Sequence, residues 1–169
     1  DSYVTNLSVY INRAKCEDAI NFVRTEGSLS NIKIVDAKSD AIDMDFSKIN
    51  LNNVIINGSG NDCLDFSYGN YYLKNIKLEK CGDKGISVGE NSKIELNSAN
   101  IKNAKIGIAV KDSSTALIGN ILLADVETCF SAYKKKKEFN GGNIEINNMN
   151  CYGYKNLKIV DRNSRILIN

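Results

Sequence analysis

Apolar and polar residues follow a block pattern that recurs along the chain at a spacing of 22 residues. We number the blocks as coils one to six; they begin at Glu17, Ser39, Asn61, Asp83, Lys105 and Glu127. The fourth and sixth positions of every coil are apolar: Ile20 and Phe22, Ile42 and Met44, Leu64 and Phe66, Ile86 and Val88, Ile108 and Val110, Phe130 and Ala132. The fifth position is mostly polar: Asn21, Asp43, Asp65, Ser87, Ala109 and Ser131. This alternation predicts a β-strand with positions four and six pointing inward.

A second alternating stretch follows the first in each coil. Its apolar members are Leu29, Ile32 and Ile34; Leu51, Val54 and Ile56; Leu73, Ile76 and Leu78; Ile94, Leu96 and Ile101; Leu117, Ile121 and Leu123; and, in a last partial coil, Leu157, Ile159, Ile166 and Ile168. The third position of each coil is always Ala, Cys or Gly, which suits a tight corner. The Leu-x-x-Leu-x-Leu signature of leucine-rich repeats is missing. The repeat therefore predicts an all-β, single-stranded, right-handed parallel β-helix, in which stacking of coils supplies the core.

The repeat also fixes the expected domain organisation. We predict one domain over residues 1–169, with a partial coil at 1–16, six coils over 17–153 and a partial coil at 154–169. Coil six is longer because it carries an insertion near 134–142. The chain starts inside a partial coil, so we expect a piece of a larger protein. Open β-helix ends expose unpaired strand edges, so we expect other segments or end-to-end self-association to cover them.

Charge and hydropathy exclude two classes of partner. Lys and Arg number 22 against 20 Asp and Glu, a net charge of +2, and no basic stripe or phosphate-binding Gly-rich loop is present, so no nucleic-acid partner is expected. The one basic run, Lys134 to Lys137, is expected to be a solvated loop. No apolar run reaches the roughly 18 residues that a membrane-spanning helix needs.

The five cysteines show no metal-binding spacing. Cys63 and Cys129 share a column but lie three coils apart, roughly 14 Å at the spacing of paired strands. Cys16 and Cys81 are separated by about as much, whereas a disulfide needs Cα atoms within about 7 Å. We therefore predict five free thiols that act as small apolar residues. A bond between any two would count against the alignment of the coils.

Carboxylates gather on the outward side of the first predicted strand. Asp40 and Asp62 occupy the second position of adjacent coils, and Asp43 and Asp65 the fifth. Stacked Asp residues that bond backbone amides at turns are one interpretation. A Ca²⁺ site at Asp43 and Asp65 is a second, because hard oxygen ligands converge there. An acid–base carboxylate pair at Asp40 and Asp62, separated by room for a water, is a third.

Three segments resemble polygalacturonase-type glycoside hydrolases of the pectin-lyase-like superfamily. Asn61-Asp62-Cys63-Leu64 is similar to their Asp-Asp-Cys-Ile segment, 82–89 to their Gly-His-Gly-Ile-Ser-Ile-Gly segment, and 39–43 to their Asn-Thr-Asp-Gly segment. The resemblance implies that Asp40 and Asp62 match catalytic carboxylates. The chain departs from the pattern at Asn61, where an Asp is expected, and at Lys84, where a His is expected. Some polysaccharide lyases on this fold pair calcium-binding acids with a Lys or Arg base, which makes Lys84 the remaining catalytic candidate; its other interpretation, which we favour, is a surface salt-bridge partner of the nearby Asp residues.

A wider resemblance covers most of the chain. The segments SDAIDMDFS, GDKGISVGENSKI, IGIAVKDSS and SAYKKKKEF resemble β-helix regions of bacterial surface proteins, some beside spore-coat CotH-like kinase domains. This implies an extracellular or cell-surface module whose partner is a polysaccharide or another surface component.

Tyr68, Tyr71 and Tyr72 cluster in coil three, where they offer a platform for sugar rings or pack on neighbouring coils. The sequence thus favours a non-catalytic module with a structural or glycan-binding role. The alternative is an enzyme that degrades acidic polysaccharides, with Asp40, Asp62 and Lys84 at its centre and calcium as its one candidate cofactor.

Overall fold

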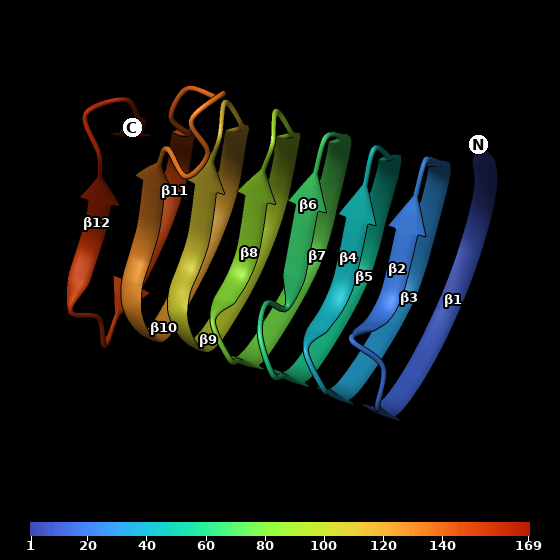
Figure 1. Cartoon of the computed structure of the whole chain (residues 1–169). Coiled ribbons are helices and arrows are strands. Elements are labelled where there is room, and N and C mark those ends of the chain that lie inside the picture. Colours follow the sequence, from blue (N-terminus) through green and yellow to red (C-terminus); the bar gives the residue numbers. More distant parts are fainter.

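The computed structural model describes residues 1–169 and confirms the all-β solenoid, with no helices and about eight coils of roughly 22 residues. The chain winds as a right-handed helix, with its termini at opposite ends of the stack (Figure 1). Its strands are β1 (Ser2–Ala14), β2 (Asp18–Val23), β3 (Thr25–Ala37), β4 (Asp40–Asp45), β5 (Lys48–Ser59), β6 (Leu64–Ser67), β7 (Asn70–Cys81), β8 (Lys84–Gly89), β9 (Lys93–Lys111), β10 (Thr115–Tyr133), β11 (Asn143–Tyr152), β12 (Asn156–Val160) and β13 (Arg165–Ile168).

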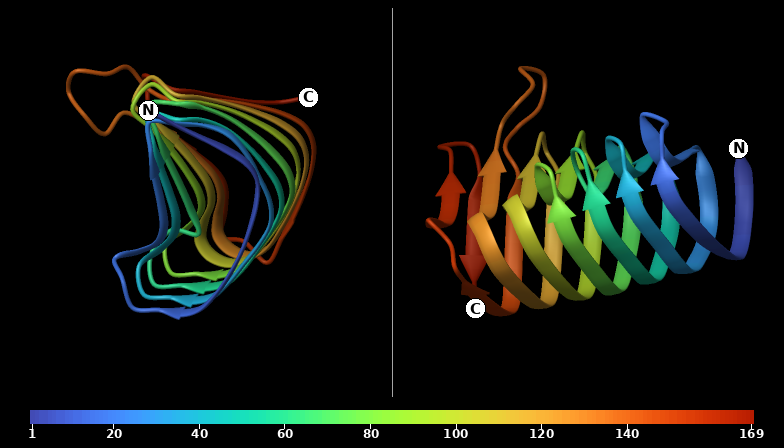
Figure 2. Two further views of the ribbon diagram at one scale, coloured as in Figure 1. Left: turned by 90° about the vertical axis from the view of Figure 1, so that its right-hand side faces the viewer. Right: turned by 90° about the horizontal axis from the view of Figure 1, so that it is seen from below.

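Every strand pairing is parallel, and the strands fall into two rows. The long strands pair in the order β1-β3-β5-β7-β9, and the short strands in the order β2-β4-β6-β8. Strands β9 and β10 run around a corner, so β9 joins both rows. The predicted register is confirmed, since Ile42 pairs with Leu64 and Asp43 with Asp65. When the solenoid is viewed along its axis, the short-strand side bends inward and the long strands bow outward (Figure 2).

Left-handed backbone conformations mark the corners. One column, between the short and the long strands, contains Arg24, Phe46, Tyr68, Glu90 and Asp112, whose φ values lie between 49° and 55°. Phe46 and Tyr68 of this column are exposed, and their rings stack on each other. The next corner falls at Asp36, Gly58 and Lys80, also at positive φ.

The core is the stacked inward columns, which form one cluster of 39 buried residues. The small third position is explained at Gly85 and Gly107. A Cβ on Gly85 would lie 2.6 Å from Ile101 Cγ2, and one on Gly107 would lie 2.7 Å from Leu123 Cδ2. Two predicted core residues are wrong: Leu117 and Ile159 point outward and are 36% and 50% exposed. Leu117 pairs with the outward Glu95, because Ala116 and Ile118 supply the inward positions.

The prediction of five free thiols is wrong. Disulfides join Cys63 to Cys81 and Cys129 to Cys151, with Cα–Cα distances of 5.4 and 6.6 Å. Each bond joins the third position of a coil to the end of the long strand in the same coil. The error was to compare cysteines only between coils, although the chain returns close to its own start within one turn. The alignment of the coils still holds, and only the exposed Cys16 is free.

The insertion at 134–142 forms a loop that projects from the corner between β10 and β11, as the end-on view shows (Figure 2). No helix in the structure has the length and apolarity required to cross a membrane. In the single chain, Tyr10 near one end and Ile159 near the other are both exposed. End-to-end association therefore stays a prediction.

Candidate functional site

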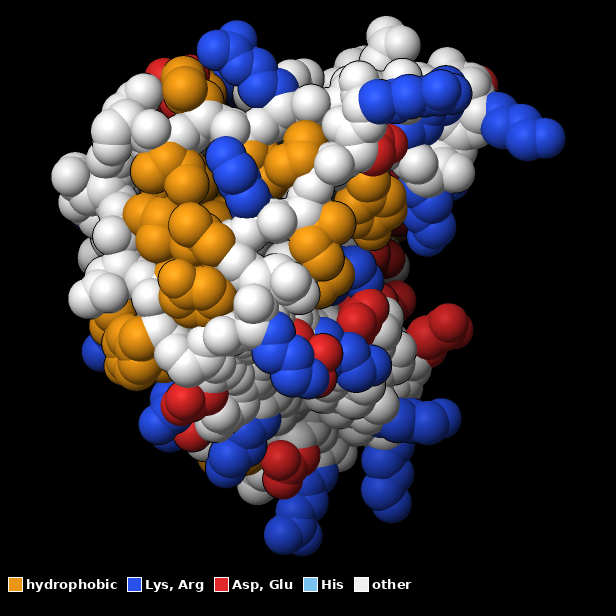
Figure 3. Space-filling model, turned by 90° about the vertical axis from the view of Figure 1, so that its left-hand side faces the viewer, with side chains coloured by type: hydrophobic (Ala, Val, Ile, Leu, Met, Phe, Trp, Pro, Cys, Tyr) orange, Lys and Arg blue, Asp and Glu red, His pale blue; other side chains and the backbone are white.

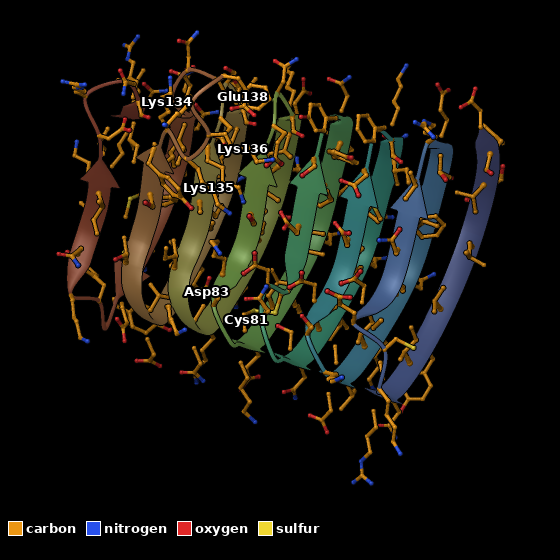
Figure 4. All side chains as sticks on the ribbon, viewed as in Figure 1. Cys81, Asp83, Lys134, Lys135, Lys136 and Glu138 are labelled. Carbon is orange, nitrogen blue, oxygen red and sulfur yellow. A yellow bond between two sulfur atoms is a disulfide. The ribbon has the colours of Figure 1, made fainter.

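The candidate site is the inward-bent face formed by β2, β4, β6 and β8 and continued by the last parts of β9 and β10. We call it the concave face. The space-filling view along the axis shows this side hollowed between a lobe that carries basic residues and a mixed acidic and basic rim (Figure 3). Figure 4 places Lys134, Lys135 and Lys136 at one edge of the face and Asp83 at the other. The fifth and seventh positions of each coil form its floor.

Asp40, Asp62 and Lys84 come together as predicted, but their contacts are with one another and with the backbone. Asp40 Oδ1 accepts hydrogen bonds from the Asp62 N–H at 2.7 Å and from Asn61 Nδ2 at 2.8 Å. Asp62 Oδ1 accepts the Lys84 N–H at 3.0 Å, and Lys84 Nζ lies 3.3 Å from the same oxygen. Lys84 Nζ also donates to the Asp83 carboxylate. The second position is therefore a ladder in which each carboxylate binds the next coil.

The charges of this ladder follow from its contacts. Burial disfavours the Lys84 ammonium, but its bonds to Asp83 and Asp62 outweigh burial and raise the pKa of Lys84 above its usual range. Burial raises the pKa of Asp62, which is only 2% exposed, while the neighbouring Lys84 opposes the rise. A Lys that acts as a general base must lose its proton near the working pH. Lys84 is instead held in its protonated state.

Asp43 and Asp65 lie side by side on the floor and are less fully bonded. Asp43 Oδ2 accepts a hydrogen bond from Asn21 Nδ2 at 2.9 Å. Burial, followed by the charges of Asp45 and Asp65, raises the pKa of Asp43 to about 7. Asp65 Oδ1 is buried and has no hydrogen-bond partner. The floor therefore presents one carboxyl that gains a proton near neutrality and one carboxylate oxygen without a donor.

No group of three or more His, Cys, Asp or Glu residues is arranged to hold a metal ion. The predicted calcium ligands Asp43 and Asp65 are thus a pair, whereas Ca²⁺ takes six to eight oxygen ligands. A calcium ion here would depend largely on water or on a ligand for its coordination.

Beyond coil three the floor changes character. Lys111 is 5% exposed, and its Nζ donates to Ser87 Oγ at 2.8 Å. Its side chain occupies the space left by Gly89, where a Cβ would lie 2.7 Å from Lys111 Cε. Ser87 and Ala109 are fully buried although they occupy outward positions. This buried Lys–Ser contact was missed from the sequence; the glycine one coil before Lys111 was the available signal.

The three tyrosines do not form a common platform. Tyr71 is buried at 3% exposure, and its hydroxyl donates to the Met44 carbonyl at 2.8 Å. Tyr72 is exposed on the long-strand side. Only Tyr68 borders the concave face, at the corner column. Its ring stacks on Phe46 with centroids 4.6 Å apart and meets the edge of Phe139 at 6.2 Å.

Loop 134–142 lies along the rim and is held by carboxylates. Asp112, which is fully buried, accepts the N–H groups of Lys135 and Lys136 on Oδ1, both at 2.8 Å. Lys136 Nζ also lies 2.7 Å from Glu90 Oε1. The loop is therefore more than the solvated segment that its four lysines predicted, because it leans back over coils five and four.

Comparison with protein-family models, with curated protein sequences and with solved structures found no match for this chain. The parallel β-helix repeat architecture therefore stands on the structure, while the pectin-lyase-like and CotH-associated resemblances gain no support from sequence.

Proposed function

We propose that the protein is a non-catalytic, exported β-helix module that binds a glycan along the concave face. The observation that carries the proposal is the pair of partly exposed carboxyls Asp43 and Asp65, which lie in register on the floor of the concave face. A hydrogen bond from a ligand contributes about 0.5–1.5 kcal/mol, and more where the acceptor is charged. Sugar hydroxyls are suitable donors, and the row of coils suits a ligand that extends along the axis.

The ladder at the second position supports binding rather than catalysis. Asp40 and Asp62 each accept a backbone N–H of the next coil, and Lys84 remains protonated between Asp62 and Asp83. Lys84 is therefore unsuited to act as a general base, and Asp40 and Asp62 each have one oxygen occupied by the backbone of the next coil. These contacts fit the interpretation of the Asp column as turn chemistry.

The two disulfides support export. Disulfides persist in extracellular and periplasmic compartments and are rare in the reducing cytosol. Cys63–Cys81 and Cys129–Cys151 both close a coil of the solenoid. A cell-surface or secreted location is therefore part of the proposal, with a polysaccharide or another surface component as the partner.

Calorimetry and affinity electrophoresis with polygalacturonate, alginate, galactomannan and mixed-linkage β-glucan test the proposal. We expect at least one probe to bind without being cleaved, and Asp43→Asn/Asp65→Asn to weaken that binding about tenfold, equivalent to one or two hydrogen bonds. Glu26→Gln, a change at an exposed β3 carboxylate with no polar contact, is the matched control and should bind normally. Equal affinity in both variants would remove the concave face from consideration.

One observation favours the enzymatic alternative, at a different pair of residues from the one predicted. Asp43 has a pKa of about 7 and lies in register with Asp65, so a general acid and a carboxylate are adjacent on one surface. Release of reducing sugars or unsaturated products from any probe, abolished by Asp43→Asn, would establish this alternative. Absence of products from all four probes would leave the binding module.

A further inference from the structure

A depression on the long-strand side lies away from the concave face. It has a volume of about 840 Å³ and extends over strands β3, β5, β7, β9, β10 and β11. Fifteen residues line it, and seven of them are asparagines. We call it the amide groove. It runs across the strands, and therefore along the axis of the solenoid.

One wall of the amide groove is a column of polar side chains, five amides and one serine, with one member in each coil. The column is Asn31, Asn53, Asn75, Ser98, Asn120 and Asn148. Its first members form a ladder: Asn53 Nδ2 donates to Asn31 Oδ1 at 3.2 Å, and Asn75 Nδ2 donates to Asn53 Oδ1 at 3.0 Å. Asn31, Asn53 and Asn75 also share a positive φ, so this part of the column has a structural role at a bend.

The ladder stops at Ser98, whose hydroxyl donates to Asn75 Oδ1 at 3.2 Å. Asn120 and Asn148 continue the column without positive φ, and their side chains make no hydrogen bond with the protein. A structural role at the bend therefore does not account for these two amides. Each presents two donors and one acceptor to the groove.

Six of the nine other lining residues are apolar, and the remaining three are Lys77, Asn100 and Asn150. Ile121 and Met149 form the floor beside the small Ala99, and Leu122 lies on the opposite wall. Lys77 is the only charged residue of the lining. The groove therefore combines amide hydrogen-bonding groups with an apolar surface, and it offers almost no charge to an ionic ligand.

We infer that the amide groove is a second binding site, which takes a neutral, unbranched polysaccharide laid along the solenoid axis. A pyranose ring presents hydroxyls at its edge and C–H groups on its face, which match the amide column and the apolar floor. The column repeats at the coil spacing of about 4.8 Å, whereas an extended peptide repeats at about 3.3 Å and loses register with it. A peptide cannot add as a strand either, because coil-to-coil pairing already uses the backbone groups of this face. A nucleic acid would need far more than one cation.

The test measures binding of linear β-mannan and mixed-linkage β-glucan, which are neutral and unbranched, with polygalacturonate and alginate as acidic probes. The variant is Asn120→Ala/Asn148→Ala, and the matched control is Asn50→Ala/Asn143→Ala, two exposed asparagines outside the groove. Both are made in the wild-type and in the Asp43→Asn/Asp65→Asn background, so that binding at the concave face does not mask the result. Circular dichroism and thermal melts compare the folding of all variants.

We expect a neutral probe to bind in both backgrounds, with affinity about tenfold lower in Asn120→Ala/Asn148→Ala and unchanged in the control. Asn120→Gln, which keeps an amide, should recover part of the loss. The inference is overturned if neither neutral probe binds, if only acidic probes bind, or if the groove variant and its control bind equally. Binding at the proposed concave-face site should weaken in the Asp variants, and binding at the amide groove in the Asn variants. The experiment can therefore contradict either proposal without contradicting the other.

Discussion

Coils two and three and coils four and five expose the same columns on the concave face, yet their floors differ. In coils two and three, three of the four outward positions are carboxyls, Asp43, Asp45 and Asp65, and the fourth is Ser67. In coils four and five, Lys111 lies folded over Gly89 and bonds Ser87, and the floor there is closed to solvent. The backbone register is continuous between the two regions. In a solenoid, the outward columns can therefore change their chemistry without changing the fold, because the inward columns, which form the core, vary independently of them.

The corner beside these floors shows a second contrast. Coils three and six close it with a disulfide, whereas coils four and five use Gly85 against Ile101 and Gly107 against Leu123. Cys151 lies in register with Leu123, so in coil six a sulfur–sulfur bond fills the space that a glycine–aliphatic contact fills in coil five. Cys81 of coil three lies three residues beyond this column, in register with Ser59.

The disulfide contrast offers the largest expected effect. Cys129→Ala/Cys151→Ala should lower the free energy of unfolding by about 3 kcal/mol, the usual cost of opening a closed loop of this length. Cys129→Gly/Cys151→Leu, which copies the pair of coil five, should recover part of that loss. Chemical denaturation under non-reducing conditions measures both. If the copied pair is no more stable than the Ala pair, the two kinds of corner are not equivalent.

Asp62 lies where the acidic floor of coils two and three meets the Lys-containing floor of coils four and five. Asp62→Ala removes the acceptor of the Lys84 N–H and one partner of the Lys84 ammonium, and should cost about 2–3 kcal/mol, because breaking a buried pair strands its partner. Asp62→Asn keeps an acceptor for the N–H and should lose less. Urea titration at pH 7 measures the difference. Equal losses would show that the N–H bond contributes little.

The acidic floor should give the protein a distinctive pH dependence. The pKa of Asp43 is about 7 in the folded chain and near 3.8 in the unfolded chain, so between these values the native state holds more protons. Stability must therefore fall as pH rises from about 4 to about 7, and Asp43→Asn should remove most of that fall. Allowing for solvent screening, we expect a gain of about 1 kcal/mol at pH 8. A pH dependence that survives in the variant would assign it to other carboxyls.

Loop 134–142 connects the two regions. Its substitution should give the smallest change in stability of those proposed here. Phe139→Ala removes the edge contact with Tyr68 and should cost about 0.5–1 kcal/mol, as for a partly exposed aromatic pair. Hydrogen exchange at Lys135 and Lys136 should remain slow, since Asp112 still accepts their N–H groups. Loss of that protection would mean that Phe139, rather than Asp112, holds the loop.

The fold was predictable because one period governs the chain, and columns four and six are apolar in all six coils. Within the candidate site, the adjacency of Asp43 and Asp65 and of Asp62 and Lys84 followed from the same period. What stayed hidden were contacts within a single turn and contacts of the inserted loop. The bond between Cys63 and Cys81 and the burial of Tyr71 depend on where corners fall, and the contact of Phe139 with Tyr68 depends on the path of loop 134–142. Column alignment carries no information on either.

The ladder of Asp40, Asp62 and Lys84 has a consequence for how the molecule comes apart. Each carboxylate bonds the backbone of the following coil, and the coil-to-coil pairing of the strands is likewise between neighbours. Apart from the contacts that loop 134–142 makes with coils three to five, stability is then a sum of nearest-neighbour links, as in other linear repeat arrays. Opening should proceed as fraying from the two ends toward coils three and four. Exchange rates of amide protons should therefore report a residue's distance from the nearer end of the stack.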